Sequence, residues 1–175
     1  MFATLARYLT TRAASLAAIL ALLATPVHGQ HPHPAPRSQP GDSAFGAMQR
    51  RGAMAMGVDQ YTSVHRFDDL ADGGRIELQR EARDSAGVHT IREHLRAIAR
   101  AFAAGDFSTP AFVHLRQVPG TATMAAKRAA IRYAFTELPG GGAVRITTTD
   151  PIAVAAVHQF LAFQRGDHHA AGIAR

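Results

Sequence analysis

Residues 131–163 read IRYAFTELPGGGAVRITTTDPIAVAAVHQFLAF, and this stretch decides the fold. Apolar and polar side chains alternate over 131–135 and again over 144–146, which is the pattern of half-buried strands. A run of three glycines between them supplies a turn. Asp150 is a good helix N-cap, and Pro151 follows at the first helical position, where proline is favoured. The stretch predicts a β-hairpin followed by an amphipathic helix.

An earlier stretch, residues 63–104, follows the same plan. A strand ends before Gly73-Gly74, a second strand alternates over 75–81, and Asp84 or Ser85 caps a helix with a clean apolar stripe. The two halves match in order at these pairs: Phe67 with Phe135, Leu70 with Leu138, Ile76 with Val144, Leu78 with Ile146, Ile91 with Val157 and Leu95 with Leu161.

The matches predict an α+β domain built from a duplicated β-hairpin–helix unit. Its four strands form one antiparallel sheet, and its two main helices cover one face of that sheet. We expect a single domain over 58–169 followed by a tail over 166–175. Its parts are repeat one over 62–104, a linker over 105–129 with an extended piece at Ala111–Leu115 and a helical turn at Thr121–Ala129, and repeat two over 130–165.

The start of the chain has the pattern of a secretory signal peptide, residues 1–29. Arg7 and Arg12 supply positive charge, Ala13–Ala24 is a short apolar run, and Val27-His28-Gly29 offers small residues for cleavage. The apolar run is shorter than the roughly 20 residues that a permanent membrane anchor needs. We expect cleavage near Gly29-Gln30 and a mature protein in the periplasm or secreted medium.

Composition narrows the possible functions further. Residues 30–57 are rich in Pro, Gly and Met and predict a flexible leader. The chain has no cysteine, which excludes disulfides, thiol redox chemistry and a lipid-carrying cysteine. The formal net charge is +6, but the export signal speaks against nucleic acid as a partner.

Histidine is the main chemical signal, with ten in the chain. The folded domain contains no HExxH motif and no histidine pair at helical metal-ligand spacing, so a metal site has to be assembled from separate elements. Imidazole with thioether sulfur suits copper, and imidazole alone suits zinc. The candidates on predicted elements are His65, His94, His114 and His158.

A longer pattern carries a family resemblance. It comprises Met56-Gly57, His65-x-Phe67, Ile91-Arg92-x-His94-Leu95, Gly105-Asp106-Phe107, Val113-His114, Met124, Ile131-x-Tyr133-x-Phe135 and Val157-His158-x-Phe160-Leu161. Over 56–169 the chain resembles a family of small exported bacterial proteins of uncharacterised function. Some members are labelled aspartate carbamoyltransferase, an enzyme with a longer two-domain chain and a Ser-Thr-Arg-Thr phosphate motif that this sequence lacks. The resemblance selects His65, His94, His114, Met124 and His158 as site residues and implies no mechanism.

Three functions remain open at this point. The first is a periplasmic binding protein that holds copper or zinc through those five residues. The second is a non-enzymatic interaction module, which binds a periplasmic protein or a second copy through the open sheet face. The third is an enzyme acting on a small acidic substrate through His and Arg, for which no nucleophile and base can be named.

Overall fold

The computed structural model describes residues 40–170 and 172, so the predicted signal peptide and residues 30–39 lie outside the described part. Its helices are α1 (Pro40–Met56), α2 (Ser85–Ala103), α3 (Ser108–His114), α4 (Thr121–Ala126) and α5 (Pro151–Asp167), with short 3-10 turns at Gln60–Thr62 and Arg128–Ala130. Its strands are β1 (Ser63–Leu70), β2 (Gly73–Arg80), β3 (Arg132–Leu138) and β4 (Gly141–Thr147). None of the helices among these residues is long and apolar enough to cross a bilayer.

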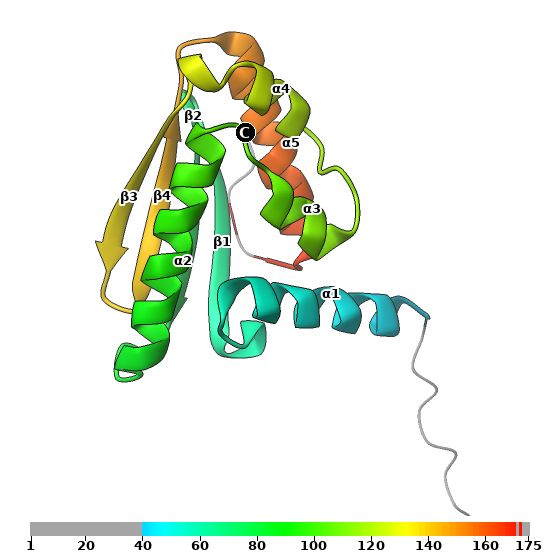
Figure 1. Ribbon diagram of the computed structural model, residues 1–175, viewed down its shortest axis with the longest axis vertical. Coiled ribbons are helices and arrows are strands. Elements are labelled where there is room, and N and C mark those ends of the chain that lie inside the picture. The colour runs from blue at the N-terminus through cyan, green and yellow to red at the C-terminus, as the bar shows by residue number, and fades with distance from the viewer. Residues whose placement is uncertain (1–39, 171, 173–175) are drawn as a thin grey trace, which may run out of the picture. The chain divides into compact units, whose positions relative to one another are not determined.

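The four strands form one antiparallel sheet in the order β1-β2-β4-β3. One row across the sheet consists of Phe67, Ile76, Val144 and Phe135, whose side chains share the face that the helices cover. Figure 1 shows α2 over β3 and β4 and α5 beside β1. The predicted α+β class, with a four-stranded antiparallel sheet and the two main helices on one face, is confirmed.

The register at the centre of the sheet is symmetric. Ile76 pairs with Val144, while Gly74 pairs with Ile146 and Leu78 pairs with Gly142. A two-fold axis between β2 and β4 would produce these pairs if Ile76 corresponds to Val144 and Leu78 corresponds to Ile146. The duplication itself stays a prediction.

Each main helix is tied to the hairpin of the other half. From α2, Arg92 donates to the carbonyls of Leu138 at 2.8 Å and Gly141 at 3.0 Å. From α5, the His158 Nε2 lies 2.9 Å from the carbonyl of Leu70 and 3.0 Å from that of Gly73. Both side chains therefore contact carbonyl oxygens at the closing pairs of the hairpins, where each oxygen has a second lone pair to accept a side-chain donor.

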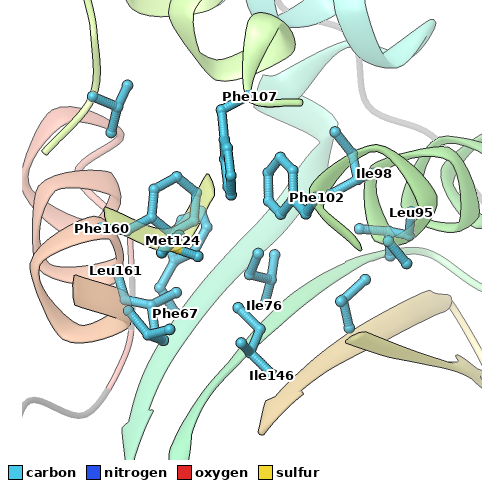
Figure 2. Packing of buried hydrophobic residues seen from close by; sticks show 14 of the residues in the cluster. Phe67, Ile76, Leu95, Ile98, Phe102, Phe107, Met124, Ile146, Phe160 and Leu161 are labelled. Carbon is cyan, nitrogen blue, oxygen red and sulfur yellow. The ribbon is translucent and has the colours of Figure 1, made fainter. Parts of the chain in front are cut away.

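The core lies between the helices and the covered face. Phe102 stacks on Phe107 with ring centroids 4.4 Å apart and meets Phe160 edge-on at 5.7 Å, an arrangement that Figure 2 shows above Ile76. Met124 is fully buried in the same cluster. Burial of these large side chains supplies most of the driving force for folding.

One ion pair is buried beneath α5. Asp69 points to the covered face, and its carboxylate accepts from the Arg165 guanidinium at 2.8 and 2.9 Å. Arg165 also donates to the carbonyl of Phe67 at 2.9 Å. The pair fixes the last turns of α5 against β1, which positions the residues that follow the helix.

The face without helices carries charged side chains. Asp68 accepts from Arg66 at 3.0 Å and from Arg75 at 3.1 Å, and Arg75 also pairs with Glu77 at 2.8 Å. These contacts make that face polar, as the alternation of β2 predicts. A partner for it stays a prediction.

Two segments differ from expectation. The leader predicted as flexible over 30–57 is helical from Pro40 to Met56. Met48 and Met56 are buried against the neighbouring elements, and this burial stabilises the helix although the sequence shows no apolar period there. The piece predicted as extended, Ala111–Leu115, is mostly the helix α3. Just before this helix the Asp106 carboxylate accepts from the Ser108 amide, which satisfies one of the free amides of the first helical turn. The helical turn predicted over Thr121–Ala129 is confirmed as α4 and the 3-10 turn after it.

Candidate histidine-lined cavity

A cavity of about 90 Å³ lies between the covered sheet face and the helices. Most of its wall is apolar. The lining residues come from α1, α2, α3, α5, β1 and β2, together with the residue that follows α5. The polar exceptions are four imidazoles, the hydroxyl of Thr109 and the amide of Gln164. A mostly apolar pocket with a few placed polar groups is the usual form of a small-molecule site.

The structure brings together three of the five predicted site residues. His65 on β1, His94 on α2 and His114 on α3 all line the cavity. His158 and Met124 do not: His158 binds the first hairpin turn, and Met124 is in the core. The role predicted for these two as site residues has no support in their contacts.

His168 completes the histidine set, and sequence reasoning missed it. The sequence predicts a tail over 166–175, but α5 runs to Asp167 and brings His168 back over the sheet. Its ring stacks on that of His65 with centroids 5.6 Å apart and 15° between planes. The sequence signal for it was the cap at Asp150. A helix of 17 residues that starts there carries His168 back to His65 on β1.

His168 is buried with an unmet hydrogen-bonding group. Its Nδ1 is inaccessible to solvent and has no hydrogen-bond partner among the described residues. Burial, together with the nearby His65 and His114, lowers the pKa of His168 to about 3. Since an unsatisfied buried polar atom costs about 1–3 kcal/mol, it marks a place where a ligand can contribute a partner.

Two other histidines of the cavity, His65 and His94, also have lowered pKa values. Burial, helped by His94, lowers the pKa of His65 to about 4. Burial also lowers the pKa of His94, against the opposing effect of a hydrogen bond to the backbone carbonyl of Ala55 on α1. Uncharged imidazole both donates and accepts hydrogen bonds and is the form that binds metal ions.

His114 has the most defined surroundings of the four. Its side chain is 1% exposed, and Nδ1 lies 2.5 Å from the carboxylate of Asp167. Nε2 lies 3.3 Å from the side-chain oxygen of Gln164. A carboxylate fixes an imidazole in this way at metal sites and in general bases. Of the residues that line the cavity, Thr109 alone has a hydroxyl.

The imidazoles are not arranged as a ready metal site. No group of three or more His, Cys, Asp or Glu side chains among residues 40–170 and 172 is placed to hold an ion. The rings of His65 and His168 stack nearly parallel, so their nitrogens do not converge on one point. The bond that His114 makes to Asp167 occupies one of its nitrogens.

No protein-family model, curated protein or solved structure matches this chain. What the protein does is therefore inferred from the chemistry of the cavity.

Proposed function

We propose that this chain is an exported, non-enzymatic binding protein that takes a small organic ligand into the histidine-lined cavity. Export rests on the charged and apolar pattern of residues 1–29. The ligand would have an apolar body, because most of the wall is apolar, and at least one polar atom that hydrogen-bonds to imidazole.

The observation that carries this proposal is the imidazole of His168, which lines the apolar cavity and whose buried Nδ1 has no hydrogen-bond partner among the described residues. Burial keeps the imidazole ring of His168 uncharged, so an uncharged partner is enough to satisfy its Nδ1. A ligand oxygen or hydroxyl would supply the bond without bringing a second charge into the apolar wall. Burial of the ligand's carbons adds affinity in proportion to the area removed from water.

Straight-chain primary alcohols from ethanol to hexanol test the proposal. Calorimetric titration of residues 30–175 at pH 7 should give saturable binding that strengthens with chain length until the cavity is full. Ile98→Phe, which enlarges a side chain of the cavity wall, should weaken binding at least tenfold. Ile152→Phe is the matched control, because Ile152 is 59% exposed at the other end of α5. Equal binding by both variants would place the alcohols elsewhere and refute the proposal.

A transition metal ion is a second candidate, and one observation favours it. The ring centroids of His168 lie 5.6 Å from His65 and 5.0 Å from His114, so rotation of the rings is the main change that shared coordination would need. Titration with Zn²⁺ and with Cu⁺ under reducing conditions, followed by imidazole ¹⁵N shifts, tests it. Coordination would shift these three rings together, while ions that bind only His31 and His33 near the expected cleavage point would leave them unchanged.

A further inference from the structure

A second pocket of about 350 Å³ adjoins the cavity and is more polar. Its wall comes from α1, from the residues that end α3 and from those that end α5. The residues that matter for its chemistry are Arg51, His114, Arg116, Asp167 and His169. His114 lines both pockets, so the two spaces adjoin at this residue. We call this second space the outer pocket and the cavity the inner one.

The outer pocket has unmatched positive charge. Arg116 places its guanidinium 4.6 Å from the ring centroid of Phe163, and Arg51 donates from Nε to the carbonyl of Val113 at 2.7 Å. Among the described residues neither arginine forms an ion pair, whereas most of the arginines on the sheet do. Asp167 is the pocket's acidic group, and its carboxylate is held by His114.

The backbone is strained on both sides of this pocket. Leu115, with φ of 52°, and His169, with φ of 50°, are the two residues other than glycine with positive φ in the described part of the chain. Leu115 ends α3 in this conformation, so that His114 and Arg116 on either side of it both face the pocket. Left-handed backbone at a bulky residue is unfavourable and tends to persist where function requires it.

We propose that the ligand is a short aliphatic carboxylate whose chain fills the inner cavity and whose carboxylate group binds Arg116 and Arg51 in the outer pocket. This inference rests on the proposed binding function and names its ligand class. Guanidinium groups bind carboxylates through charge-assisted, often paired hydrogen bonds. The inner cavity, at about 90 Å³, is small, so the part of the ligand that it takes is a short aliphatic chain.

The test compares straight-chain carboxylates from acetate to octanoate with primary alcohols of equal carbon number, by calorimetry at pH 7 on residues 30–175. Affinity for the acids should rise about fourfold with each methylene until the cavity is full, and then stop rising. Each acid of fitting length should bind at least tenfold more tightly than its alcohol, because a hydrogen bond to a charged group is stronger than a neutral one.

Arg116→Gln should remove most of the difference between acid and alcohol while leaving alcohol binding unchanged. Arg100→Gln is the matched control, because Arg100 is an exposed arginine on α2 that lines neither pocket. It should leave both affinities as they are.

The remaining outcomes separate the two proposals. If acids and alcohols bind alike and Arg116→Gln changes neither, the outer pocket plays no part, and only the inner-cavity function stands. If Arg116→Gln weakens acids of every length equally and chain length has no effect, an anion binds in the outer pocket alone, and the two-part ligand is wrong. If neither series binds at millimolar concentration, both proposals fail.

Discussion

Replacing His168 with glutamine should make the protein less sensitive to acid. The folded-state pKa of His168 is about 3, whereas its ordinary value is 6.5. Between these two values the unfolded chain takes up a proton at this position and the folded chain does not. The wild-type protein therefore has its full stability above pH 6.5 and loses part of it as the pH falls toward 3. The glutamine side chain does not titrate, so the His168→Gln variant lacks this loss.

The size of the effect follows from the shift. At pH 5 the solution lies 1.5 units below the ordinary value of 6.5, and the folded-state ring is still uncharged. At about 1.4 kcal/mol per unit, wild type should lose about 2 kcal/mol more than the variant between pH 7 and pH 5. The variant will be less stable at pH 7 if glutamine packs poorly. The quantity to compare is therefore the change in the free energy of unfolding between pH 7 and pH 5, for each protein separately.

Urea unfolding followed by far-ultraviolet circular dichroism at pH 7, 6 and 5 measures this difference. His89→Gln is the matched control, because His89 lies on the exposed side of α2 away from the cavity. Parallel curves of unfolding free energy against pH for wild type and His168→Gln would show that the ring is not held uncharged in the fold. The burial of the histidine set would then be wrong.

Other substitutions test the fold itself. Asp69→Asn should lower the free energy of unfolding by about 3–5 kcal/mol, because it leaves Arg165 charged and largely buried. Urea unfolding measures this loss, and adding Arg165→Met to the same chain should recover part of it. Gly74→Ala should lower the unfolding free energy by about 1–3 kcal/mol, since a Cβ there would lie 2.2 Å from the Leu161 side chain; an unchanged melting temperature would contradict the packing of α5 on β2. Gly46→Ala on α1 meets ordinary contacts and should raise stability by about 0.5–1 kcal/mol, which a thermal scan detects.

The hairpins and the two main helices were predictable because each has a strong local pattern. The caps at Asp84 and Asp150 are where the sequence places them, and both side chains accept backbone amide hydrogens. The helix α1 was not predictable, because its buried positions, Met48, Gln49, Gly52 and Met56, include a glutamine and a glycine, so their helical spacing does not form an apolar stripe. Its packing depends on α3, which lies far along the chain.

The site was predictable only in part, for a similar reason. His65 and His94 stand within recognisable elements, so their faces could be argued from periodicity, whereas His114 lies on α3, where the sequence predicts an extended piece. His168 follows the end of α5, and its position depends on the exact helix end and on the Arg165–Asp69 ion pair. The shape of the outer pocket depends on the left-handed backbone of Leu115, and no pattern in the sequence predicts that conformation.

α2 packs mainly on the second hairpin and α5 packs on the first, and this crossed arrangement affects how the chain folds. The contacts of His158 span 85 and 88 positions of sequence, and those of Arg92 span 46 and 49. α2 packs mainly on the second hairpin, so much of the apolar side of β1 and β2 stays uncovered until α5 has been synthesised. Loops of this length close slowly, which favours late, all-or-none folding. A chain interrupted before Pro151 should stay open and sensitive to proteolysis.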